Sequence, residues 1–355
     1  MPAASVDTFF ACSLMVLLVL SAMASTSKLL YPYMNYAVGK NVVERYKQIS
    51  RYLLLNAGTP ADWGKSNRAT PTTFGIAKTG SDESYDLDVD KVTRLNGENV
   101  YAISYAQMFS ALKMPDISFR IEIKPMFEVT INLTATYAGT NETIYQFEIS
   151  TAKHGVPIPA DLKRYSIAEE YLETANPLTS NGRAYVNTTI PSTVRGPALI
   201  IVLARSVYQR RAASFNSYSF AHGSAKPEPN GTFLRLGLLN HTLTASFAQS
   251  NVTLLKTCAF TFDHSSTLSR TTSDNQSARY SIPHFADSSP IIIVSTGTNS
   301  TTFFTEQIAY PQIPLQTGAD FATLKTHAKV SAYTYFVTID SAIYECIVWI
   351  GGLKD

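Results

Sequence analysis

The residues with the clearest chemistry in this sequence are asparagines in the pattern Asn-X-Ser/Thr, the acceptor of N-linked glycosylation. Eight such sequons occur, and none has Pro in the middle position. Seventeen asparagines in a chain with this content of Ser and Thr would give roughly three sequons by chance. The six asparagines before residue 132 all lie outside sequons. The candidate glycosylation sites are Asn132, Asn141, Asn187, Asn230, Asn240, Asn251, Asn275 and Asn299.

N-glycans are attached to chain that has crossed a membrane. The sequons therefore predict that the body from residue 132 onward is extracellular and coated with glycans.

Two cysteines of the last third could form a disulfide. Cys258 and Cys346 both lie in strand-like sequence, and an oxidising compartment favours their pairing. The alternative is a pair of buried thiols. Cys12 lies inside an apolar segment and is interpreted as a small core residue.

Other side chains that could do chemistry do not form a motif. The six histidines are isolated, without metal-ligand spacing. Asp86-X-Asp88-X-Asp90 is similar to a calcium loop, but Lys91 replaces the required Gly and Gly97 the bidentate Glu. A turn that enters a helix explains this run better. The sequence predicts no catalytic residue, no metal and no cofactor.

The first element that must position these residues is a long N-terminal helix. Residues 8–25 carry no charge, and apolar residues then recur at spacings of three and four up to residue 54. This pattern predicts a helix over residues 1–56 with a transmembrane or filament-core half, and a single-pass membrane protein with an extracellular C-terminal body. A cleaved secretory peptide ending at Ala24 is the alternative. Lys28, Lys40 and Arg45 favour the opposite orientation by the positive-inside rule, but the eight sequons outweigh them.

The N-terminal third also resembles a known family. Ser5-Val-Asp7-Thr before an apolar helix, an amphipathic half and a β-rich head are similar to archaeal type IV pilin-like proteins. The sequences at 58–64 (GTPADWG), 72–77 (TTFGIA) and 85–96 (YDLDVDKVTRLN) resemble a block of archaeal envelope proteins of uncharacterised function. The resemblance covers residues 1–125 and implies that Asp7 acts in filament assembly. A helix N-cap is the alternative role for Asp7.

The remaining sequence predicts a mainly β protein. Residues 57–116 are expected to form an irregular connection with short helices, because Pro, Gly, Ser and Thr are frequent there. Alternation with period two from residue 117 predicts a β-sandwich at 117–212 and a second β-sandwich at 213–355, which ends in a hairpin at Asp340-Ser341. The order of strands and turns at 143–205, with a Gly-Val-Pro-X-Pro turn and a Gly-X-Ala-X-Val strand, resembles the immunoglobulin-like modules of surface proteins and implies an Ig-like fold for 117–212. The predicted fold class is therefore a long, pilin-like N-terminal helix followed by two Ig-like β-sandwiches.

Composition limits the function. The chain has 355 residues, 45% of them hydrophobic and 16% charged, and its net charge of +2 is scattered, which excludes nucleic acid as a partner. We expect a non-enzymatic cell-surface glycoprotein, a pilin-like or envelope subunit with a structural or adhesive role. Its expected partners are membrane lipid or neighbouring pilin-like helices at residues 5–30, in a homo-oligomer or filament. The alternatives are a membrane-tethered extracellular module that binds polysaccharide or peptide, and a secreted hydrolase.

Overall fold

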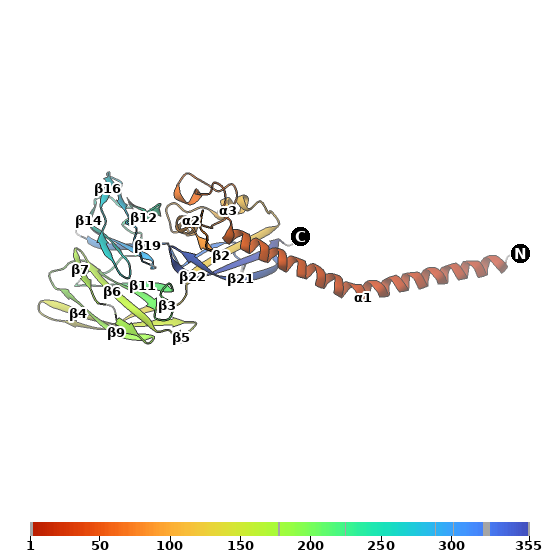
Figure 1. Cartoon of the computed structure of the whole chain (residues 1–355), viewed down its shortest axis with the longest axis horizontal. Coiled ribbons are helices and arrows are strands. Elements are labelled where there is room, and N and C mark those ends of the chain that lie inside the picture. The colour runs from red at the N-terminus through yellow and green to blue at the C-terminus, as the bar shows by residue number, and fades with distance from the viewer. Residues whose placement is uncertain are drawn as a thin grey trace. The chain divides into compact units, whose positions relative to one another are not determined.

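In the computed structural model, the backbone is described at residues 3–176, 178–223, 225–287, 289–300, 302–321 and 327–353. Within these ranges, the side chains of residues 3–10, 12, 27, 29–41, 327–329 and 353 lie outside the description. The chain divides into two compact units, Met1–Arg51 and Tyr52–Asp355. The second unit contains all of the β structure (Figure 1).

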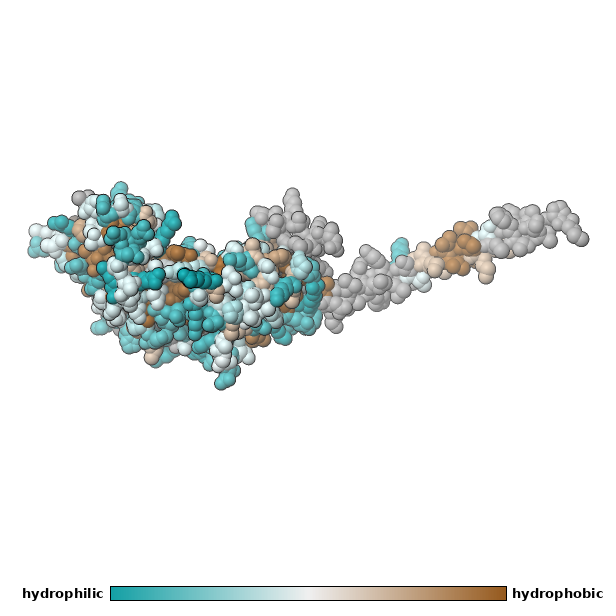
Figure 2. Space-filling model, turned by 90° about the horizontal axis from the view of Figure 1, so that it is seen from above, coloured by the Kyte–Doolittle hydropathy of each residue, from teal (hydrophilic) through white to brown (hydrophobic). Residues whose placement is uncertain are grey.

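Helix α1 spans Ala3–Leu55. Its described apolar side chains between Leu14 and Met23 are 52–70% exposed and form the brown stretch of the helix in Figure 2. Among the described residues, no helix combines the length and the apolar character needed to cross a membrane. The expected single-pass membrane localisation is therefore corrected, together with the transmembrane and pilin-like descriptions that depended on it. Contacts of residues 5–30 with lipid or with other helices stay a prediction.

A first β-sandwich occupies residues 126–220. Its two antiparallel sheets share one core, in which Phe147 and Ile149 pack with Ile200 and Val202 of the facing sheet. One sheet contains β3 (Glu128–Ala138), β4 (Glu142–Lys153), β5 (Val156–Pro157) and β9 (Arg183–Pro191). The other contains β6 (Ala160–Ala168), β7 (Tyr171–Thr174), β8 (Leu178–Ser180), β10 (Ala198–Ser206) and β11 (Ala213–Phe220).

A second β-sandwich follows at residues 234–310, with a core of its own around Leu238, Leu243 and Ile293. One of its sheets has the order β12-β13-β17-β16, and the other has the order β15-β14-β18-β19. The strands are β12 (Leu234–Leu239), β13 (Thr242–Phe247), β14 (Val252–Phe260), β15 (Ser265–Thr267), β16 (Arg270–Ser273), β17 (Ser277–Ser281), β18 (Ile291–Asn299) and β19 (Thr302–Tyr310).

The sequence of strand β10 is continuously apolar because the strand is buried on both faces. Ile200 and Val202 point into the first sandwich, whereas Leu199, Ile201 and Leu203 pack with side chains of the second. Every residue from 198 to 204 is at most 1% exposed. The two sandwiches are therefore joined by a hydrophobic contact, since apolar area removed from water on both sides of one strand stabilises the arrangement.

A third sheet joins distant parts of the chain in the order β1-β21-β22-β2-β20 (Figure 1). Strand β22 lies next to β2, with Phe119 opposite Ile350. The strands are β1 (Asp86–Leu87), β2 (Ile117–Pro125), β20 (Leu315–Gly318), β21 (His327–Ile339) and β22 (Ala342–Leu353). The helices of this region are η1 (Trp63–Lys65), α2 (Val89–Leu95) and α3 (Tyr105–Leu112).

The predicted fold class is wrong as a whole. The chain is mainly β, and it contains two sandwiches, but β2 and β20–β22 belong to neither of them. The expected boundaries at 117–212 and 213–355 therefore do not describe the sheets. The physical reason is long-range pairing: β2 and β22 each bury apolar side chains in a common sheet, and local alternation does not show which strand is the partner. The hairpin at Asp340-Ser341 is confirmed, with both residues at positive φ, as a tight two-residue turn requires.

Candidate functional site

The sequon asparagines are almost all accessible. Seven of the eight are exposed, and Asn299 is half-buried. Asn132 shows the local reason, because it points outward from β3 between the inward-facing Ile131 and the half-buried Leu133. Asn240 and Asn251 lie in turns and have positive φ, a conformation that asparagine tolerates better than most residues. Their accessible positions are compatible with attached glycans.

The three sequons of the first sandwich all lie on the sheet of β3, β4 and β9. Asn132 is on β3 and Asn187 on β9, and these two strands flank β4 on either side. Asn141 lies in the turn between β3 and β4. The facing sheet, which packs against the second sandwich, contains no sequon.

Asn230 differs from the other sequon residues because its carboxamide is already paired. Its Nδ2 donates to the main-chain oxygen of Gln307 at 2.7 Å, and its Oδ1 accepts from the main-chain N–H of Gln307 at 2.9 Å. Both bonds go to one residue of β19, so the paired hydrogen is the one on the same side as Oδ1. In a trans amide the substituent on nitrogen occupies that side. A sugar on Asn230 would therefore displace this pair.

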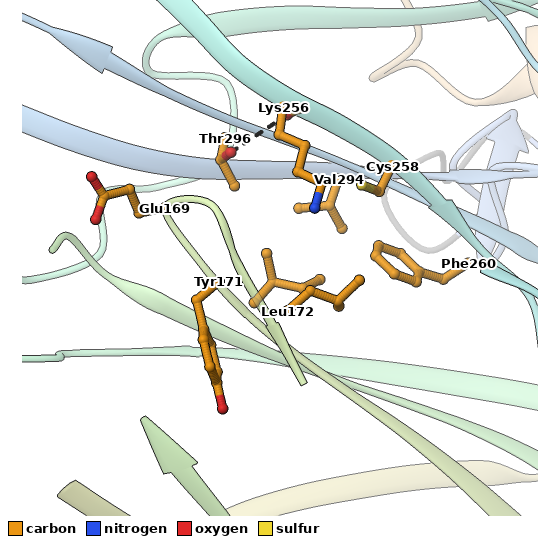
Figure 3. A pocket seen from close by; sticks show the side chains of 9 residues that line it. Glu169, Tyr171, Leu172, Lys256, Cys258, Phe260, Val294 and Thr296 are labelled. Carbon is orange, nitrogen blue, oxygen red and sulfur yellow. Dashed lines mark hydrogen bonds between the residues drawn. The ribbon is translucent and has the colours of Figure 1, made fainter. Parts of the chain in front are cut away.

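The predicted disulfide is wrong: Cys258 and Cys346 are both free, buried thiols. They belong to different sheets, Cys258 to β14 and Cys346 to β22. Figure 3 shows Cys258 beside Phe260 and Val294 at a cavity of about 10 Å³, which has room for roughly one water molecule. Burial raises the pKa of the Cys346 thiol, and the charge of Glu122 adds to this effect. Each thiol therefore behaves as a small core residue.

The acidic residues singled out in the sequence have structural partners. Asp88 caps helix α2 by accepting from the main-chain N–H groups of Asp90 and Lys91, both at 3.0 Å. Asp86 accepts from Ser81 Oγ at 2.7 Å. The interpretation of this run as a turn into a helix is confirmed. Among the described residues, no group of three His, Cys, Asp or Glu could hold a metal ion. The side chain of Asp7 lies outside the described residues.

Two histidines meet where the second sandwich contacts α2. The rings of His241 and His284 are 3.8 Å apart, and His241 packs edge-on against Tyr310 at 5.2 Å. Tyr310 donates to Oδ1 of buried Asp90 at 2.7 Å. Burial, followed by the repulsion of His284 and Lys65, lowers the pKa of His241 to about 4. Burial likewise raises the pKa of Asp90. This cluster fastens α2 to the second sandwich.

A cleft with a volume of about 900 Å³ lies in the β-rich unit. Its wall is formed by the segment that follows α2, by β12, and by β19 with the loop after it. Five carboxamides line it: Asn96, Asn99, Asn230, Gln307 and Gln312. The titratable residues of the lining are Glu98 and Arg235, which carry opposite charges.

Three of these carboxamides hold the wall together. Asn96 donates to the main-chain oxygen of Gln312 at 3.0 Å, across 216 residues of sequence. Asn99 donates to the main-chain oxygen of Leu238 at 3.3 Å and accepts from Tyr101 N–H at 2.9 Å. Asn230 pairs with Gln307 as described above. The Oε1 atoms of Gln307 and Gln312 are buried and have no hydrogen-bond partner among the described residues.

No protein-family model matches this chain, and no similar sequence was found among curated proteins. The resemblance to archaeal pilin-like proteins gains no support from these comparisons. The cleft was missed in the sequence because its carboxamides come from three separate segments and form no local motif. The spacing Asn96-Gly-Glu-Asn99 after a short helix was the one available signal, and it is typical of an ordinary loop.

Proposed function

We propose that this protein is a non-enzymatic, N-glycosylated cell-surface protein with a structural or adhesive role. One observation carries the proposal: the sequons coincide with exposed asparagines. Seven of the eight sequon asparagines are exposed and Asn299 is half-buried, whereas the asparagines outside sequons include the buried Asn96 and Asn99 as well as exposed residues. None of the eight is buried, as the attachment of a glycan requires.

The placement of the sequons supports a role at a surface. Asn132 and Asn187 lie on the two strands that flank β4, and exposed edge strands are the places where one β protein pairs with another. A glycan on each strand would block such pairing by its bulk. The opposite sheet needs no such protection, because it is covered by the second sandwich.

The chemistry of the large cleft favours binding over catalysis. Carboxamides accept and donate hydrogen bonds but do not exchange protons near neutral pH. General acid–base catalysis requires titratable groups close to the reacting atoms. Asp90, His241 and Tyr310, whose pKa values are shifted, form a separate cluster around Tyr310 and are absent from the lining of the cleft.

Surface labelling of the cells that make the protein tests this proposal. Intact cells are treated with a membrane-impermeant biotin reagent, and the captured protein is digested with an N-glycosidase. We expect biotin on the protein before lysis and a loss of apparent mass after digestion. A cytosolic protein serves as the control for cell integrity. Labelling only after lysis, or an unchanged mass, would contradict the proposal.

A further inference from the structure

We propose that the cleft of about 900 Å³ in the second unit binds a neutral carbohydrate chain. This inference extends the proposed function, because it names the ligand class of an adhesive surface protein. The volume lies in the range of about 300–1,000 Å³ that small-molecule sites occupy. An oligosaccharide of a few units fits such a space.

The wall of the cleft is preorganised by its own hydrogen bonds. Asn96, Asn99 and Asn230 use their side chains to fix the main chain of Gln312, Leu238 and Gln307. These bonds tie the segment after α2 to the second sandwich. A fixed wall reduces the conformational entropy that a ligand loses on binding, so binding energy is not spent on ordering loops.

Two side-chain carbonyl oxygens of the cleft wall have no hydrogen-bond donor in the described part of the chain. Gln312 is 8% exposed, and its buried Oε1 has no partner among the described residues; the same holds for Oε1 of Gln307. A buried carbonyl without a hydrogen-bond donor is destabilising. The Oε1 atom of Gln312 has almost no accessible surface, so a sugar hydroxyl can donate to it only when the side chain turns toward the cleft; the same hydroxyl can accept from an amide N–H.

Charge and apolar surface narrow the ligand class further. Glu98 and Arg235 balance each other, so the lining has no net charge that would select an anion or a cation. Val100, which is 51% exposed, and the half-buried Phe215 supply apolar surface beside the amides. Sugars combine hydroxyl edges with C–H faces, so a neutral carbohydrate matches both kinds of surface. A charged oligosaccharide does not match this lining.

The decisive variant is Gln312→Leu, which keeps the approximate size of the side chain and removes the amide. If Gln312 had only a structural role, removal of its unpaired buried carbonyl would leave the stability of the protein unchanged or raise it. The affinity for the sugar would then stay the same. For a binding residue, affinity falls while stability is kept. Gln316→Leu is the matched control, because Gln316 is exposed on β20 and outside the cleft lining.

The experiment titrates full-length protein, made in a host without N-glycosylation, with neutral trisaccharides of glucose, mannose, galactose and N-acetylglucosamine. Calorimetry should find binding of at least one with a Kd of about 1 mM or tighter. Gln312→Leu should weaken it about tenfold, or about 1.4 kcal/mol, and Gln316→Leu should leave it unchanged. If Gln312→Leu fails to fold by circular dichroism, Val100→Ser, at an exposed position, takes its place with the same expectation.

Three results would overturn the inference. The first is the absence of binding to every neutral trisaccharide. The second is equal or tighter binding of a uronic-acid trisaccharide or a neutral tripeptide. The third is binding that the folded cleft variant leaves unchanged. None of them depends on whether the protein carries glycans, so failure here is distinct from failure of the proposed surface function.

Discussion

Asparagine has two different tasks in this chain, and Asn230 shows the difference. Most sequon asparagines are exposed, but Asn230 forms two hydrogen bonds to the main chain of Gln307. Its carboxamide therefore pairs with the main chain of β19 beside the cleft, as a neighbouring strand would. A local sequence motif reports only that Asn230 could accept a sugar. The position of its partner, 77 residues away, decides whether it does.

The substitution Asn230→Asp tests the structural role of this residue. The change replaces the N–H donor with a second carboxylate oxygen facing the Gln307 carbonyl. We expect a loss of about 1–3 kcal/mol in the free energy of unfolding, measured by denaturant titration of unglycosylated protein. Asn275→Asp, in an exposed turn, is the control and should change it by less than about 0.5 kcal/mol. Equal effects of the two substitutions would contradict the assigned role.

His241 should make the protein sensitive to acid. Its pKa is about 4 in the folded chain, against about 6.5 for an unperturbed histidine side chain. The unfolded chain therefore binds a proton at higher pH than the folded chain, and stability is lost as pH falls from about 6.5 through about 4. Asp90 and its raised pKa oppose this trend, whereas His284 and Lys65 add to the repulsion around His241.

The measurement for His241 is the melting temperature between pH 7 and pH 4.5. His241→Gln, which keeps the sequon at Asn240, should lose less stability over this range than the unchanged protein, by about 3 °C or more. His154→Asn at an exposed turn is the control and should follow the unchanged protein. A parallel fall in all three proteins would show that His241 does not titrate in this way.

At the scale of elements, the central strand of the third sheet joins segments that are far apart in the sequence. β22 pairs with β21 on one side and with β2 on the other. Ile350 is fully buried between Phe119 of β2 and Ser331 of β21. Strand β22 therefore holds in place a strand that precedes it by more than 200 residues of sequence.

Ile350→Ala should destabilise this sheet by about 2–5 kcal/mol, because it removes buried methyl groups and leaves a cavity. Hydrogen exchange should rise in β2 and β22 while β10, in the contact between the sandwiches, stays protected. Thr334→Ala, on the exposed face of β21, is the control. Uniform loss of protection would mean that the third sheet is not a separate cooperative element.

The elements differ in how far the sequence could predict them. Period-two alternation and the Asp340-Ser341 turn correctly indicated strands and a hairpin, because both are local patterns. The apolar run of β10 is typical of a buried strand, but it does not show that the second face of the strand packs against another sandwich. Pairing of β2 with β22, the Cys258 and Cys346 environments and the cleft all depend on contacts between distant segments, which one sequence does not contain.

At the scale of the whole molecule, the unit Tyr52–Asp355 contains the hydrophobic core clusters of both sandwiches and of the contact between them. The described part of α1 has its apolar side chains exposed between Leu14 and Met23. Exposed apolar surface of this kind promotes association in water. The two units should therefore respond differently to truncation.

Removal of residues 1–41 should keep the fold of the β-rich unit and reduce self-association. We expect a melting temperature within about 2 °C of the full chain and a sharper monomer peak in size-exclusion chromatography with light scattering. Val16→Asn with Leu20→Asn in the full chain is a matched variant, which should also reduce association. Unfolding of the truncated protein would contradict the independence of the second unit.

We propose that the exposed sequons of the two sandwiches carry glycans on a surface protein. Site-by-site peptide mapping of the protein from its own cells, before and after N-glycosidase, tests this claim most directly. We expect glycans at the exposed Asn132, Asn141, Asn187 and Asn275, and an unmodified Asn230. Unmodified asparagine at all eight sequons would contradict the claim, and a fully glycosylated Asn230 would contradict its assigned pairing with Gln307.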